Sequence, residues 1–209
     1  MTMDLHENIR VTSPISGTLH EDALKAWKNK KYKEAIILYE RLANNGSAEA
    51  MLILAKFYLG DGSVVTRDPK RSREWAEKAL ESGWTPEVAL FLGHLYYSGE
   101  CYGPDYKSAY KIYKRFENKN EKFTLDDARG IFRLGVMYEL GRGVEKDFQK
   151  AEESYRKSAK IGNIHARKNL AVLNLKQGNW IKGYMLWIGA IIRGWLCIIC
   201  TPHSRKILP

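Results

Sequence analysis

Cysteine is scarce in this chain, and a secretory leader is not evident. Only Cys101, Cys197 and Cys200 occur among 209 residues, which is too few for the disulfide framework of a small secreted protein. The N-terminal sequence MTMDLHENIRVTSPISGTLHED has no apolar stretch followed by small residues, so it does not resemble a signal peptide. Both absences indicate a protein of the cytoplasm.

Acidic residues are missing from the last part of the chain. Residues 154–209 contain 10 Lys and Arg and no Asp or Glu, whereas residues 1–153 contain 24 basic and 24 acidic residues. The whole net charge of +10 therefore comes from the C-terminal segment. A block of one sign is typical of a segment that meets lipid headgroups, nucleic acid or an acidic protein, although scattered Lys and Arg also form solvated faces.

Residues that would carry catalysis or bind a metal are not grouped. The histidines, His6, His20, His94, His165 and His203, lack the spacing of metal ligands or of a catalytic triad. Cys197, Cys200 and His203 supply three zinc-ligand types, but a structural zinc site needs a fourth. Gly141 and Gly143 are not followed by the Lys-Ser/Thr pair of a phosphate loop, so we interpret them as turn glycines. We predict no catalytic, cofactor-binding or metal-binding residue.

The chain does contain an internal repeat. Its clearest copy has Ala151 as an anchor, with Tyr155, Ala159 and Gly162 at offsets of four, eight and eleven. The anchors of the copies are Ala35, Ser72, Ala109, Ala151 and Gly183, with spacings of 37, 37, 42 and 32 residues. A period of this size predicts a repeat architecture in which each unit buries its apolar face against its neighbours.

Each copy also has a recognisable first half. Leu54, Leu92, Leu134 and Leu170 are each followed by a small residue, and usually by Tyr at the fourth position. This spacing places the three residues on one helix face, where the small residue allows close helix packing.

Capping residues divide every copy into two helices. The expected N-caps are Ser47, Thr85, Thr124, Asp68, Asp105 and Asp147. Gly46, Gly83 and Gly162 suit helix C-termini, where we expect the left-handed conformation. The sequence thus predicts helical hairpins, and stacked hairpins form a solenoid.

The motif LG-x-x-Y-x-x-G-x-G-V-x-x-D-x-x-K-A-x-x-x-Y-x-x-x-A-x-x-G at 134–162 resembles the Sel-1-like repeat, a relative of the tetratricopeptide repeat. The copies at 50–83 and 88–120 are degenerate, and those at 20–46 and 166–194 have the shorter loop of a tetratricopeptide repeat. The resemblance implies an all-α, right-handed α-solenoid of about five helical hairpins. It also implies a non-catalytic adaptor or scaffold that binds a protein or peptide partner.

Two other classes of function remain open. An enzyme or regulatory protein would need a polar site in the concave groove, which linear spacing does not reveal. A helical RNA-binding repeat has a similar period, but the first 153 residues are neutral overall, which makes a nucleic-acid partner the weaker alternative.

The stretch IKGYMLWIGAIIRGW, at 181–195, is apolar on every side. Where the preceding copy has charged residues on its solvent face, this copy has apolar ones. We predict a docking patch of Tyr184, Met185, Ile188, Ile192, Arg193 and Trp195. Its occupant could be an anionic membrane surface, a membrane-bound partner or a second copy of the chain, or the protein's own tail could cover it.

These observations define an expected organisation. Residues 1–17 form a flexible N-terminal segment, 18–195 the repeat solenoid, and 196–209 an apolar, basic tail. The protein is expected in the cytoplasm, peripheral at the inner face of a membrane, with no cofactor.

Overall fold

The computed structural model describes residues 14–60, 65–117, 123–181 and 183–189, and every regular element in these ranges is helical. The elements are α1 (Pro14–Lys28), α2 (Tyr32–Asn44), α3 (Ala48–Leu59), α4 (Pro69–Ser82), α5 (Pro86–Ser98), α6 (Tyr106–Lys114), the short 3-10 helix η1 (Arg115–Glu117), α7 (Leu125–Leu140), α8 (Phe148–Ile161) and α9 (Ile164–Lys176). A further helical stretch, 183–189, follows α9. The predicted all-α class is confirmed.

The helices begin where the capping residues indicated. The Ser47 side chain accepts a hydrogen bond from the Ala50 N–H at 3.2 Å. At α7 the Asp127 N–H donates to Thr124 Oγ1 at 3.2 Å, and the Thr124 N–H donates to Asp127 Oδ2 at 2.7 Å. Thr85, Asp68, Asp105 and Asp147 cap their helices in the same way. Such caps satisfy N–H groups that the helix itself leaves unpaired.

The glycines at helix ends followed the expectation with one exception. Gly46 and Gly162 have positive φ angles of 88° and 128°. The prediction was wrong for Gly83: its φ of 172° is extended, a conformation that any residue adopts, so this helix end does not require the left-handed region. Gly143 does require glycine: a Cβ on this residue would lie 2.1 Å from the carbonyl oxygen of Tyr106.

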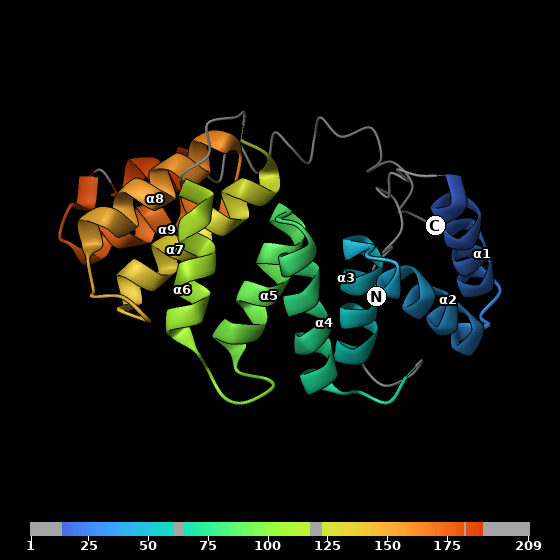
Figure 1. Ribbon diagram of the computed structural model, residues 1–209. Helices are drawn as coiled ribbons and strands as arrows, with labels where there is room; N and C mark the ends of the chain where they lie inside the picture. Colours follow the sequence, from blue (N-terminus) through green and yellow to red (C-terminus); the bar gives the residue numbers. More distant parts are fainter. Residues whose placement is uncertain (1–13, 61–64, 118–122, 182, 190–209) are drawn as a thin grey trace, which may run out of the picture. The chain divides into compact units, whose positions relative to one another are not determined.

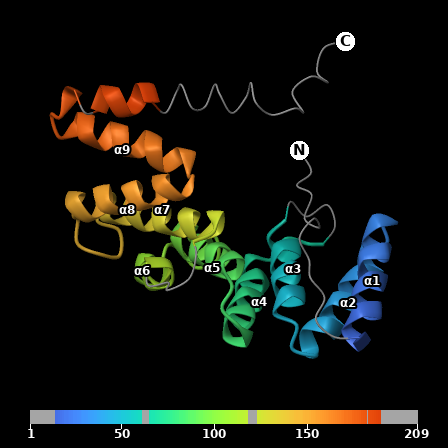
Figure 2. The ribbon, with the colours of Figure 1, turned by 90° about the horizontal axis from the view of Figure 1, so that it is seen from above.

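The chain divides into two compact units within α5. The first unit contains α1–α4 and α5 up to Leu95, together with residues 100–102; the second contains the rest. In the first unit α1 packs on α2, α2 on α3, and α3 on α4 (Figure 1). In the second unit α6 packs on α7, α7 on α8, and α8 on α9 (Figure 2). Each unit is therefore a stack of helices that are neighbours in sequence, as a solenoid requires.

The repeat register is confirmed by burial. The anchors Ala35, Ser72, Ala109 and Ala151 are completely buried, and Gly183 is buried as well. Small side chains at these positions allow neighbouring helices to approach closely. The Ser72 hydroxyl uses this proximity to donate to the carbonyl oxygen of Ala55 in α3 at 2.7 Å.

The first halves of the repeats also pack as predicted. Leu54, Leu92, Leu134 and Leu170 are all buried. Gly135, which follows Leu134 in α7, lies against α8: a Cβ at this position would be 2.8 Å from two ring carbons of Tyr155. Glycine at position 135 thus leaves the space on α7 that the large Tyr155 ring of α8 occupies.

Aromatic rings fill the core of the first unit. The rings of Trp27 and Phe57 stack with centroids 4.6 Å apart, and Tyr39 meets Phe57 edge-on at 5.7 Å. The Tyr39 hydroxyl is buried without a hydrogen-bond partner in the described part of the chain. Burial raises the pKa of this phenol to about 12, and the nearby Glu49 carboxylate adds to the effect.

Candidate functional site

Seven of the described residues, all in the second unit, line a pocket of about 260 Å³. We call it the polar pocket; its residues are Lys114, Glu117, Tyr138, Lys150, Glu153, Ser154 and Lys157. They come from α6, η1, α7 and α8, so the site exists only when three successive helices are stacked. Linear spacing did not reveal it, because its members are up to 43 positions apart in the sequence (114 to 157).

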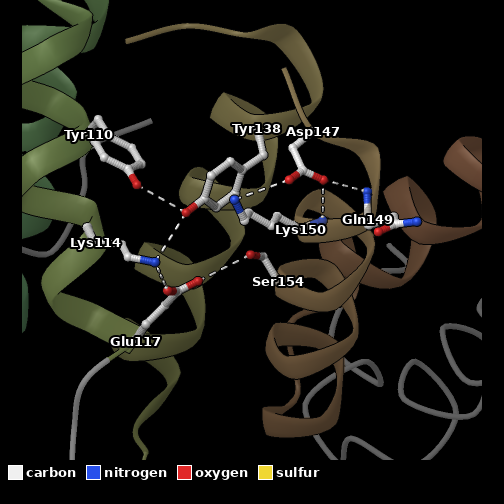
Figure 3. Close-up of polar contacts among 8 residues, drawn as sticks. All are labelled: Tyr110, Lys114, Glu117, Tyr138, Asp147, Gln149, Lys150 and Ser154. Carbon is white, nitrogen blue, oxygen red and sulfur yellow. Dashed lines mark hydrogen bonds and ion pairs between the residues drawn. The ribbon is translucent and has the colours of Figure 1, made fainter. Parts of the chain in front are cut away.

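A hydrogen-bonded chain runs through the polar pocket (Figure 3). The hydroxyl oxygens of Tyr110 and Tyr138 lie 3.1 Å apart, and Lys114 Nζ donates to the Tyr138 oxygen at 3.2 Å. Lys114 also forms an ion pair with Glu117, which accepts a hydrogen bond from Ser154 Oγ at 3.5 Å. Residues from four elements thus hold one another in fixed positions.

Two further lysines lie next to this hydrogen-bonded network. Lys150 Nζ lies 3.2 Å from Asp147 Oδ2 and 5.8 Å from the centre of the Tyr138 ring. Lys157 Nζ donates to the backbone oxygen of Glu117 at 3.0 Å. Three ammonium groups and two carboxylates therefore line the pocket, and its charges largely compensate one another.

Two groups of the polar pocket, Lys114 and Tyr138, have raised pKa values. Burial raises the pKa of Tyr138 to about 12, and the hydrogen bond to Tyr110 adds to this. Burial lowers the pKa of Lys114, but the hydrogen bonds to Glu117 and Tyr138 outweigh it, and the net pKa is raised. Both groups keep their protons at neutral pH, so neither is prepared to act as a base or nucleophile.

The predicted docking patch lies partly within the described residues. Tyr184, Met185 and Ile188 are 53%, 71% and 47% exposed, as expected for a solvent face that has become apolar. Ile192, Arg193 and Trp195 lie outside the described residues, as do Cys197, Cys200 and His203.

Other apolar side chains extend this exposed region. Trp180 and Ile181 are exposed too, and with Tyr184, Met185, Trp187 and Ile188 they form what we call the C-terminal face. Among the helices of the described ranges, none combines the length and apolar character needed to cross a membrane.

One residue of this face departs from the burial pattern of the repeat. Trp187 occupies the anchor-plus-four position, which holds the fully buried Tyr155 in the preceding copy, yet it is 44% exposed. Tyr155 is covered because the next helix, α9, brings Asn169 within 3.4 Å of its hydroxyl oxygen. Among the described elements, no helix follows 183–189 to cover Trp187 in the same way.

The repeat pattern, its caps and its buried anchors decide the family. The family model of the Sel1 repeat matches this chain at residues 28–47, 48–84, 86–120 and 128–163. The chain belongs to the Sel1 repeat family. Proteins of this family are typically scaffolds for protein–protein interaction. The matched ranges end before the copy that we expected at 166–194.

Curated relatives share only part of their length with this chain. The chain is 31% identical over 132 residues to the Arabidopsis thaliana ERAD-associated E3 ubiquitin-protein ligase component HRD3B, covering 63% of this chain and 20% of HRD3B. It is 27% identical over 122 residues to the Sel1-repeat-containing protein YjcO of Escherichia coli, covering 58% of this chain and 51% of YjcO. The chain thus spans about a fifth and about half of these two proteins.

Solved structures share the fold. A Sel1 repeat protein from Oxalobacter formigenes matches with a TM-score of 0.67 and 24% identity, covering 93% of this chain and 76% of that one. The protective antigen c5321 of uropathogenic Escherichia coli matches with a TM-score of 0.70 and 22% identity, covering 86% of this chain and 38% of that one. These similarities show the helical-repeat fold and no more.

Proposed function

We propose that the protein is a non-catalytic scaffold that binds a protein or peptide partner and docks to an anionic membrane surface through its C-terminal face. The observation that carries the proposal is the cluster of six exposed large apolar side chains within residues 180–188. This cluster lies in the part of the chain, from residue 154 onward, that has no acidic residue.

The scaffold part rests on the family and on the chemistry of the polar pocket. Family members typically hold partners, and HRD3B is by its name a component of a ligase assembly. In the polar pocket Lys114 and Tyr138 retain their protons at neutral pH. The pocket therefore offers fixed charges and hydrogen bonds, which suit recognition of a partner.

The membrane part rests on side-chain chemistry. Trp and Tyr are enriched at membrane–water interfaces, and the C-terminal face contains Trp180, Tyr184 and Trp187. Burial of one large apolar side chain contributes about 1.5–3 kcal/mol, and each Lys or Arg near an anionic surface adds about 1 kcal/mol. A few such contributions together suffice for reversible, salt-dependent attachment.

Vesicle flotation with a matched pair of variants tests this docking. Ile188→Glu should weaken binding to phosphatidylglycerol-containing vesicles by roughly tenfold or more, because about 2 kcal/mol of apolar burial is lost and a negative charge is added. Ile37→Glu is the control: Ile37 is 52% exposed on α2, in the other unit. Added salt should weaken attachment of the intact protein.

Three outcomes would contradict parts of the proposal. If the intact protein does not bind anionic vesicles at low salt, the proposed membrane docking is wrong. A concentration-dependent dimer that Ile188→Glu dissociates would assign the C-terminal face to a second copy of the chain. Catalytic turnover that is abolished by Lys114→Gln in the polar pocket would replace the scaffold by an enzyme.

A further inference from the structure

A second hollow lies between α8, α9 and the helical stretch 183–189. It has a volume of about 360 Å³. Its lining consists of Arg156, Ala159, Lys160, Arg167, Leu170, Met185, Leu186 and Gly189. We call it the basic groove. Unlike the polar pocket, it combines three cationic side chains with an apolar wall, and no acidic side chain is among the described residues that line it.

The cations of the basic groove come from two neighbouring helices, α8 and α9. Arg156 and Lys160 are four positions apart on α8, so they project from the same side of that helix. Arg167, on α9, donates from Nη2 to the backbone oxygen of Ala159 at 3.4 Å, which directs its guanidinium toward α8. Arg156 is partly occupied by an ion pair with Glu152, whereas Lys160 has no ion pair within the described ranges.

The apolar wall joins the groove to the C-terminal face. Met185 belongs to both: it lines the groove and, at 71%, is more exposed than Tyr184 and Ile188, the other described residues of the predicted docking patch. Met185 and Gly189, four apart, border the groove, and Tyr184 and Ile188 form the adjacent row of the same helical stretch. A ligand in the groove would thus meet cationic side chains from α8 and α9 and apolar side chains from the stretch 183–189.

We propose that the basic groove binds the phosphate headgroup of an anionic phospholipid, with the first part of the acyl chains against Met185 and Leu186. This inference rests on the proposed membrane docking, and it adds the class of lipid that the protein binds. Arginine and lysine recognise phosphate oxygens by charge-assisted hydrogen bonds. A free phosphate would use the cations but leave the apolar wall without a partner, which is why a lipid is the occupant that fits.

Two charge-matched double variants separate a specific site from general attraction. Lys160→Gln with Arg167→Gln removes two cations of the basic groove, and Lys111→Gln with Lys168→Gln removes two exposed cations elsewhere in the second unit. Both lower the net charge equally. Binding to vesicles of phosphatidylcholine with phosphatidylglycerol should fall by roughly tenfold or more for the groove variant, and by far less for the control.

A soluble lipid tests the groove without a membrane. Monomeric dihexanoyl phosphatidylglycerol should bind the intact protein and change its tryptophan fluorescence, since Trp187 directly follows Leu186, which lines the groove. The groove variant should lose this response, and the control variant should keep it. Circular dichroism of both variants verifies that the helices remain folded.

The results distinguish this inference from the proposed function. If vesicles bind but the two double variants lose affinity equally, the groove inference is wrong and the docking proposal stands. If the soluble lipid binds in a groove-dependent manner but vesicles do not, the docking proposal is wrong and the lipid site stands. If glycerol phosphate binds the groove as tightly as the soluble lipid, the ligand is a free phosphate and the lipid assignment is overturned.

Discussion

Substitution of Gly130 by Ala should destabilise the second unit, although the same change normally stabilises a helix. Gly130 lies in the middle of α7 and faces η1. A Cβ there would lie 2.4 Å from Cγ and 2.5 Å from Cδ2 of Phe116. Favourable carbon–carbon contacts begin at about 3.5 Å, so the ring must move by roughly 1 Å. Phe116 is only 2% exposed, and it has little room for such a shift.

Two opposing contributions determine how much Gly130→Ala changes the free energy of unfolding. Overpacking a buried contact costs about 1–3 kcal/mol, and the higher helix propensity of Ala offsets about 1 kcal/mol of this. We expect a net loss of up to about 2 kcal/mol, which corresponds to a decrease in Tm of roughly 2–8 °C. Thermal and urea unfolding followed by circular dichroism measure it. Gly189→Ala is the control, because a Cβ there meets no atom of the described residues within 4 Å.

Combining Gly130→Ala with a substitution of Phe116 provides a sharper test. In a Phe116→Ala protein the obstructing ring is gone, so Gly130→Ala should become neutral or stabilising through helix propensity. If Gly130→Ala raises the Tm of the otherwise unchanged protein, the close α7–η1 contact does not exist in solution and the reasoning is refuted.

The repeat register and the buried tyrosines give two further expectations. Ala151→Leu should cost about 1–3 kcal/mol by overpacking, whereas Glu152→Leu should be nearly silent; equal losses in urea unfolding would show that the register is wrong. Stability should fall as pH rises above about 10, because the unfolded chain then ionises phenols that the folded protein keeps neutral: Tyr39 and Tyr138 have raised pKa values of about 12. Tyr39→Phe should reduce this alkaline loss, and unchanged pH dependence would contradict it.

Much of the local structure was determined by the sequence. Caps such as Ser47 and Thr124 act through N–H groups two or three residues away, so short motifs suffice to locate helix starts. The anchor positions could also be predicted from the sequence. A residue that recurs every 32–42 positions in a stack of similar hairpins meets the same neighbours in every copy.

Sites that combine several helices were decided by the tertiary structure alone. The polar pocket needs Lys114 from α6, Tyr138 from α7 and Ser154 from α8. None of these belongs to a chemical motif, and only the stacking of the helices brings their polar atoms within hydrogen-bond distance.

Exposure at the C-terminal face shows the same division. The sequence alone established that residues 184, 185 and 188 replace charged positions by apolar ones. Trp187 has the same place in the repeat as the buried Tyr155, four residues after the anchor. Burial, however, is a property of what packs against a residue. Tyr155 has α9 beside it, and Trp187 has no described helix in that place. A repeat pattern therefore determines which side chains can be covered, and only the neighbouring helix decides which of them are.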